Sequence, residues 1–299
     1  MAQQWTGVWP AITTAFNADL SVDHGFIRQH VQWLIENGCT GIVPIGSLGE
    51  GATLNFEEKV AILKTVVAAV GPAVGVVPGI AALSTSDAVR LAKAAKEAGC
   101  AGLMVLPPYL YSSDVREMHA HVSAVIKATD LPCILYNNPV AYKTDFTPEQ
   151  IAELAREHDN LQAVKESSTD ARRISGIRAV IGNKLALGVG VDDCLVEGVA
   201  MGAQFWIAGL VNAFPKESVK LYELARAGNM DEAQALYRWF LPLLRLDTVV
   251  KFVQLIKLAQ QQVNVGNERV RPPRLTLVGR EREETLAIVR TALQNQPII

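Results

Sequence analysis

The sequence predicts a (β/α)8 barrel, the TIM-barrel fold of the α/β class, with a C-terminal helical appendage. Short apolar runs rich in β-branched residues alternate with longer amphipathic stretches. The pair recurs eight times at intervals of roughly thirty residues, which is the length of a βα unit. After residue 228 the strand-like runs stop and only helical patterns follow.

The eight strand candidates are brief and apolar nearly throughout, as strands buried on both faces of a parallel sheet must be. In chain order they are 8–14, 41–45, 74–79, 102–106, 133–136, 161–165, 185–189 and 204–208. Helices are expected near 23–37, 55–70, 85–98, 114–128, 148–157, 170–181, 192–201 and 215–227. Eight such units favour a closed barrel over an open doubly wound sheet. No GxGxxG motif follows the first strand, as a dinucleotide-binding sheet would require.

Helix start signals support two of these helices. Thr147 and Gln150 have the spacing of a capping box, with Pro148 at the first helical position. Asn55 and Glu58 form a weaker version of the same pattern.

We expect a single structural unit in two parts. Residues 1–228 form the barrel, and residues 229–299 form a helical extension packed on it. The helices of the extension are expected at 230–244, 246–264 and 281–294, interrupted by the RPPR loop at 271–274. Neither a low-complexity segment nor a flexible linker separates the two parts.

Composition and charge exclude several classes of function. With 49% hydrophobic and 19% charged residues and a net charge of −2, the chain has a globular composition and no electrostatic footprint for nucleic acid or an anionic membrane. The N-terminus resembles no signal peptide, and no run approaches the ~20 apolar residues of a membrane span. We therefore expect a cytoplasmic protein with neither a nucleic-acid nor a membrane partner. The four Cys and five His lack ligand spacing, which predicts no disulfide and no metal site.

Functional groups of such barrels lie where strands end and the following loops begin. Lys165 closes the apolar run 161–164, so its amine should lie inside the barrel mouth, partly desolvated. Desolvation disfavours the ammonium form and lowers the pKa, as an amine that attacks a carbonyl requires. The alternative interpretation is a surface lysine paired with Glu166.

Two other strand ends carry polar groups. Tyr136 closes the run 133–135 and is either a proton shuttle or an aromatic core residue. The segment Gly46-Ser47-Leu48 offers backbone N–H groups and one hydroxyl to an anion such as a carboxylate, although a plain tight turn explains the glycine equally well. We interpret Glu50 as a group that fixes this loop rather than as a catalytic carboxylate.

Taken together, GSLGEGATL at 46–54, YNNP at 136–139 and VKESS at 164–168 resemble the dihydrodipicolinate synthase / N-acetylneuraminate lyase superfamily. The resemblance implies that Lys165 is the Schiff-base lysine, that Tyr136 is the general acid/base, and that Ser47 holds the substrate carboxylate. It also implies a homotetramer, a dimer of dimers, acting on a small 2-oxo acid or imino acid. Schiff-base chemistry needs no cofactor, because the protonated imine is itself the electron sink. The implied pocket residues are Gly46, Ser47, Leu48, Asn138, Tyr109, Tyr111, Gly190 and Ile207.

Departures from the synthase pattern concern the substrate. The loop after the second strand reads GSLGE, where synthases usually carry GTTGE. Their tyrosine relay needs a tyrosine that aligns with Leu110, unless Tyr109 or Tyr111 takes its place. Their arginine for the second substrate's carboxylate aligns with Ala141, and the loss of a bidentate clamp is not a conservative change.

These departures disfavour lysine biosynthesis. The segments YNNPVAYKTD and VKESSTDARRI look more like the 1-pyrroline-4-hydroxy-2-carboxylate deaminases of hydroxyproline catabolism, which release ammonia and 2-oxoglutarate semialdehyde. A dihydrodipicolinate synthase, or an aldolase or dehydratase of 2-oxo-3-deoxy sugar acids, uses the same first steps and stays open. A non-enzymatic homologue that binds small acids is disfavoured, because Lys165 and Tyr136 are both present.

Overall fold

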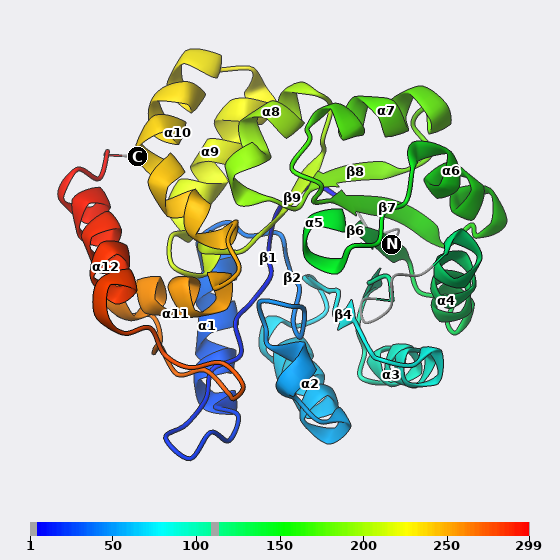
Figure 1. Cartoon of the computed structure of the whole chain (residues 1–299), viewed down its shortest axis with the longest axis horizontal. Helices are drawn as coiled ribbons and strands as arrows, with labels where there is room; N and C mark the ends of the chain where they lie inside the picture. Colours follow the sequence, from blue (N-terminus) through cyan, green and yellow to red (C-terminus); the bar gives the residue numbers. More distant parts are fainter. Residues whose placement is uncertain (1–4, 109–113, 299) are drawn as a thin grey trace.

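A computed structural model describes residues 5–108 and 114–298 of the chain (Figure 1). Parallel strands curl into a barrel surrounded by helices, which confirms the predicted (β/α)8 fold with C-terminal helices. The strands are β1 (Gly7–Pro10), β2 (Gly41–Ile42), β3 (Gly75–Val76), β4 (Gly79–Ile80), β5 (Leu103–Val105), β6 (Cys133–Asn137), β7 (Leu161–Glu166), β8 (Ala186–Val189) and β9 (Phe205–Ala208).

The strands close into a ring. Hydrogen-bonded neighbours run in the order β1-β9-β8-β7-β6-β5-β4, and β2 pairs with β3. Gly79 N donates to Pro44 O at 3.0 Å, so the pairing continues past residues 77–78. For this reason β3 and β4 are two halves of one barrel strand. A parallel bridge between Ala11 and Val43 joins β1 to β2 and completes the ring.

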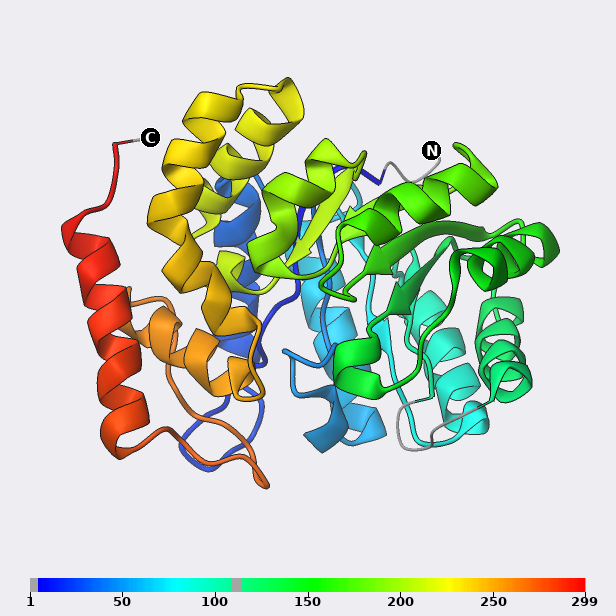
Figure 2. The ribbon, with the colours of Figure 1, turned by 45° about the horizontal axis from the view of Figure 1, so that its top comes forward.

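Helices follow the strands on the outside of the barrel (Figures 1 and 2). Both predicted capping boxes are confirmed. In each, the side chain of the cap residue, Thr147 or Asn55, accepts a hydrogen bond from the backbone N–H of the third helical residue. The side chain of that third residue accepts one in return from the backbone N–H of the cap residue. The helices are α1 (His24–Glu36), α2 (Phe56–Val70), α3 (Thr85–Glu97), α4 (Val115–Lys127), α5 (Pro139–Tyr142), α6 (Pro148–Glu157), α7 (Arg172–Ile181), α8 (Leu195–Ala200), α9 (Pro215–Ala227), α10 (Met230–Leu244), α11 (Phe252–Gln262) and α12 (Gly279–Gln294).

The observed helices differ from the expected ones in three places. The helix expected at 192–201 divides into a 3-10 turn at Asp192–Cys194 and α8. The division occurs because the Asp192 carboxylate turns inward and accepts hydrogen bonds from backbone N–H groups that follow β9. The helix expected at 246–264 is preceded by another 3-10 turn, Arg245–Asp247, and α11 begins later. The short helix α5 was not expected. Asn138 caps it by accepting a hydrogen bond from the backbone of its first turn.

Alternation along the strands divides the apolar side chains between two cores. One core lies between the barrel and the helices, and the other fills the barrel with residues such as Met104 and Ile134. On β7, Ala163 belongs to the inner core and Val164 to the outer one. Since side chains alternate with a period of two, Lys165 points inward again, above the packed interior.

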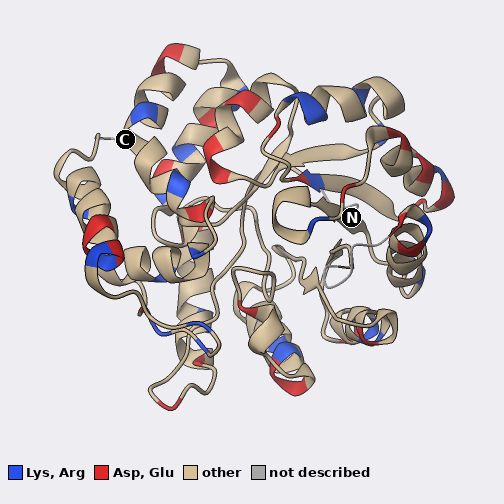
Figure 3. Cartoon of the chain, in the orientation of Figure 1, with Lys and Arg blue, Asp and Glu red and all other residues tan. Residues whose placement is uncertain are grey.

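The C-terminal helices lie along one side of the barrel. Helix α10 packs on α8 and α9, and α12 packs on α10 and α11 (Figures 1 and 2). Acidic and basic residues are interspersed along these and the other outer helices (Figure 3). Within the described residues, no helix is long and apolar enough to cross a membrane.

A buried ion pair ties these helices to the loop after β2. Glu50 accepts hydrogen bonds from Lys257 Nζ at 2.5 Å and from Arg271 N at 3.0 Å, and both members of the ion pair are buried. Lys257 Nζ also donates to Arg269 O at 2.6 Å. Burial lowers the pKa of Lys257 to about 8, although the charge of Glu50 raises it. This geometry agrees with the interpretation of Glu50 as a group that fixes its loop.

We expect Glu50→Gln to lower the free energy of unfolding by about 3–5 kcal/mol, because it leaves the Lys257 ammonium buried without a counter-charge. The matched control is Glu281→Gln. It removes the ion pair between Glu281 and Lys251, which is exposed but has the same length, 2.5 Å, as the buried pair. That change should cost at most about 1 kcal/mol. Chemical denaturation of both variants measures the difference, and equal losses would contradict the role of the buried pair.

Candidate active site

Lys165 and Tyr136 are neighbours across the β6–β7 pair. The parallel register sets them opposite each other, two residues beyond the pair Ile134–Ala163, which lies inside the barrel. Both side chains therefore point into the barrel mouth, and both residues are 6% exposed. Lys165 Nζ lies 4.1 Å from the centroid of the Tyr136 ring, so the aromatic face stabilises the cationic form at close range.

The Lys165 amine is desolvated at this position. Burial lowers its pKa to about 8, although the charges of Asp247 and Asp192 raise it. At this pKa about one amine in ten is neutral at pH 7. The alternative of a surface ion pair with Glu166 does not fit, because that carboxylate accepts hydrogen bonds from the Asn137 side chain at 3.1 Å and from a backbone N–H at 2.7 Å.

A glycine after β8 leaves space for the lysine side chain. A Cβ atom on Gly190 would lie 2.0 Å from Ser167 Oγ and 2.5 Å from Lys165 Cε. Any side chain at this position would therefore displace the amine. Ile207, the other predicted pocket residue on this side, is buried among the barrel-filling side chains of β9.

The Tyr136 hydroxyl stands in a row of polar groups. Asn138 Nδ2 donates to it at 2.9 Å. Burial raises the pKa of Tyr136, while hydrogen bonding to Asn138, Ser167 and Tyr142 lowers it in part. The Ser47 hydroxyl is hydrogen-bonded to the Tyr142 phenol, whose ring meets that of Tyr136 edge-on at a centroid distance of 5.7 Å. Hydroxyl groups thus connect the loop after β2 to the end of β6.

The predicted anion-binding loop is a tight turn. Gly51 N donates to Gly46 O, and Glu50 N donates to Ser47 O, each at 3.1 Å. The Leu48 side chain is buried in the core between the barrel and the helices, so only its backbone is left to face a ligand. Both interpretations of the glycines therefore agree with the geometry.

Three polar residues at the mouth, Tyr142, Asp192 and Asp247, are not among the site residues that the sequence predicts. Tyr142 directly follows Ala141, the position that aligns with the synthases' arginine. The direction of its side chain depends on helix α5, which the sequence did not predict. Asp192 is buried and accepts hydrogen bonds from Trp206 Nε1 at 3.1 Å and Leu210 N at 2.7 Å. Asp247 comes from the C-terminal extension, and a search of strand ends alone could not find it.

The remaining positions that the sequence analysis named add no described contact to Lys165 or Tyr136. Tyr109 and Tyr111 lie outside the described residues, as does Leu110. Ala141 is exposed, and so is the nearby Lys143, whose amine donates to a backbone carbonyl of α5 at 2.9 Å.

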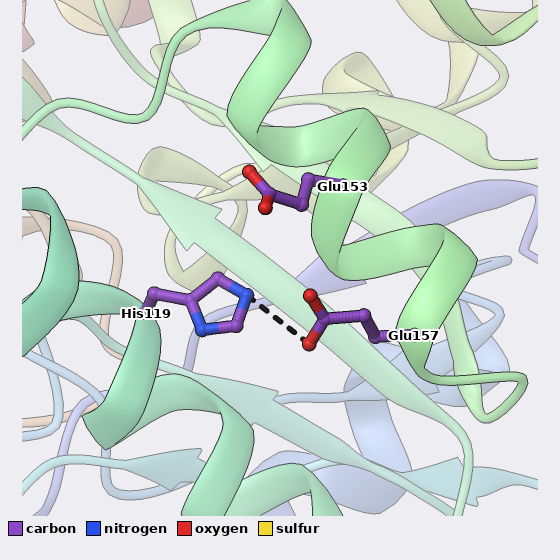
Figure 4. Close-up of side chains that lie close together, drawn as sticks. All are labelled: His119, Glu153 and Glu157. Carbon is purple, nitrogen blue, oxygen red and sulfur yellow. Dashed lines mark ion pairs between the residues drawn. The ribbon is translucent and has the colours of Figure 1, made fainter.

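One group of possible metal ligands lies on the outer helices. His119 on α4 stands beside Glu153 and Glu157 on α6 (Figure 4), with one ligand atom of each within 4.8 Å of the others. The spacing of these residues does not indicate the group, because His119 is far from the two glutamates in the chain and meets them only through helix packing. It lies outside the barrel and includes no residue of the barrel mouth.

The fold and the mouth together define a class of protein: a (β/α)8 barrel with a desolvated lysine amine at its mouth. The comparisons with known proteins agree. The model of the dihydrodipicolinate synthetase family matches residues 4–292. The 4-hydroxy-tetrahydrodipicolinate synthase of Geotalea daltonii is 31% identical over 284 residues, which cover 94% of this chain and 96% of the relative. An uncharacterized DapA-like lyase of Thermofilum pendens is 31% identical over 98% of this chain and 99% of its own.

Solved structures extend this likeness to three dimensions. A dihydrodipicolinate synthase from Bacillus anthracis superposes with a TM-score of 0.92 at 26% identity and covers 99% of both chains. A putative dihydrodipicolinate synthetase from Pseudomonas aeruginosa gives a TM-score of 0.91 at 27% identity, over 97% of this chain and 100% of its own. The chain belongs to the dihydrodipicolinate synthetase family and is a Schiff-base lyase of that family.

We expect pyruvate and borohydride to leave one reduced pyruvate adduct, a carboxyethyl group on the amine, per chain at Lys165. Peptide mapping provides an internal control, because Lys257 is also buried with a pKa near 8 but is committed to Glu50. The initial rate of trapping should rise with pH through about 8, since only the neutral amine attacks the carbonyl. Modification at another lysine would contradict the assignment.

Proposed function

We propose that Lys165 attacks C2 of a 2-oxo acid or cyclic imino acid. Ser47 and the N–H groups of Ser47 and Leu48 hold the substrate carboxylate, and Tyr136 transfers protons at the Schiff base. The observation that carries this proposal is the desolvated Lys165 amine against the Tyr136 ring in the barrel mouth. The hydroxyls of Ser47 and Tyr142 supply a path along which the Tyr136 proton can be exchanged.

As the physiological substrate we propose 1-pyrroline-4-hydroxy-2-carboxylate. Addition of the amine to the C2 imine opens the ring by transimination, and the ring nitrogen becomes a primary amine on C5. The iminium acidifies C3, and loss of the C3 proton is followed by loss of the C4 hydroxyl. Tautomerisation then gives an imine at C5. Hydrolysis of both imines releases ammonia, 2-oxoglutarate semialdehyde and the free lysine, with one water consumed overall.

The site residues support this choice over condensation with a second carboxylate. Ala141 occupies the position where the resemblance places the synthases' arginine, and the Lys143 amine is engaged with a backbone carbonyl. Asp247 brings a carboxyl group, rather than a cation, to the mouth. Dihydrodipicolinate synthase is the second candidate, because the names of the curated relatives favour it over a deaminase. An aldolase or dehydratase of 2-oxo-3-deoxy sugar acids would share the same lysine.

Tyr136→Phe should lower kcat by roughly 10²–10⁴, because it removes the group that transfers protons. Trapping with pyruvate and borohydride should suffer less, since water can assist that step. The matched control is Tyr222→Phe, which removes a buried phenol that bonds the backbone of Gly7 and Gln204 instead. That variant should keep its kcat. A Tyr136→Phe variant with nearly normal kcat would assign Tyr136 to packing alone.

We expect ammonia release from 1-pyrroline-4-hydroxy-2-carboxylate and negligible condensation of pyruvate with aspartate semialdehyde. A carboxylate that enters without a cationic partner should lose about a thousandfold in affinity. Parallel coupled assays of the two reactions measure this directly, and Ala141→Arg should not improve deamination. Condensation at ordinary enzyme rates without deamination would establish the synthase candidate instead.

A further inference from the structure

Asp247 reaches the barrel mouth from the C-terminal extension. It ends the 3-10 turn Arg245–Asp247 between α10 and α11. Its carboxylate lies directly on Gly209, the first residue after β9, since a Cβ atom there would lie 2.0 Å from Asp247 Oδ1. The ring order is β6-β7-β8-β9. Lys165 on β7 therefore has Tyr136 on the β6 side and Asp247 on the β9 side.

The two carboxyl groups near Lys165 have different environments. The Asp192 carboxylate is held by the indole of Trp206 and by the backbone N–H groups of Gly209 and Leu210. For Asp247, by contrast, residues 5–108 and 114–298 provide no hydrogen-bond donor to the carboxyl group. Asp192 is thus committed to holding the backbone after β9, whereas no residue of the described ranges competes with a ligand for the Asp247 carboxyl group.

The surroundings of Asp247 favour its protonated form. Burial raises the pKa of Asp247 well above the ordinary value, and the charges of Asp192 and Asp193 raise it further, while Lys165 lowers it. Burial also raises the pKa of Asp192, to about 6, but there the hydrogen bonds from Leu210, Gly209 and Trp206 lower it in part. No such hydrogen bond from a described residue lowers the pKa of Asp247, so of the two acids it is the better placed to keep a proton. Tyr136 stands on the other side of the lysine, so the two groups can serve different atoms of a bound substrate.

We propose that Asp247 is a second acid of this active site and protonates the hydroxyl group that leaves from C4 of the Lys165-bound substrate. The inference rests on the proposed deamination. Removal of the C3 proton turns the iminium into an enamine, whose electron pair expels the C4 oxygen as the C3–C4 double bond forms and the iminium returns. Asp247 gives its proton to that oxygen, so water departs and a carboxylate remains. Solvent restores the proton.

The test compares Asp247→Asn with Asp130→Asn, which removes an exposed acid whose side chain pairs with Lys96 at 2.6 Å. Ammonia release from 1-pyrroline-4-hydroxy-2-carboxylate should fall by roughly 10²–10⁴ in Asp247→Asn and stay within about threefold of wild type in the control. Borohydride trapping of pyruvate, which has no leaving group, should continue in both variants. The 4-fluoro analogue should restore much of the lost turnover, because fluoride departs without a proton.

Gly209→Ala provides an independent variant. Its methyl group would occupy the place of the Asp247 carboxyl, so it should reproduce the selective loss of deamination while leaving the acid itself in the chain. An Asp247→Asn enzyme that keeps the wild-type kcat overturns the inference. Equal losses with the hydroxy and fluoro substrates, or a parallel loss of pyruvate trapping, also overturn it in favour of a structural role. A wild-type enzyme that releases no ammonia would overturn the proposed function and this inference together.

Discussion

The register between β6 and β7 holds a lysine amine inside the mouth of the barrel, away from bulk water. Burial of a charge is costly, and the lysine responds with a pKa lowered to about 8. The rest of the mouth is arranged around this constraint. The Tyr136 ring and two carboxyl groups limit the cost of the ammonium form, and Gly190 leaves room for the side chain.

The C-terminal helices belong to this arrangement as much as the strands do. Through Lys257 they hold Glu50 and the loop that carries Ser47, and through Asp247 they reach the end of β9. The first connection buries two charges, so it must be made between specific partners rather than with water. A barrel without these helices would leave Glu50 with no counter-charge from α11 and the β9 side of the mouth without Asp247.

Much of the fold and part of the site were predictable because they depend on local patterns. The end of an apolar run indicated that the Lys165 amine lies inside the barrel mouth, while Tyr136 at the end of its own run was open to two interpretations. The two capping boxes were predictable because they join residues only three apart. Tyr142 was missed as a site residue because a four-residue helix turns it toward Ser47, and nothing in its spacing shows that turn.

By itself, the sequence determined the order of βα units, the polar groups at the strand ends and the lysine that closes the sixth apolar run. The tertiary structure alone decided which distant groups surround that lysine. Lys165 lies on a strand, Asp192 on the turn after β8, and Asp247 on a C-terminal segment. The three meet only when the barrel closes and the C-terminal extension packs against it. Their pKa values depend on mutual burial and charge, and these act through space between groups that the chain keeps far apart.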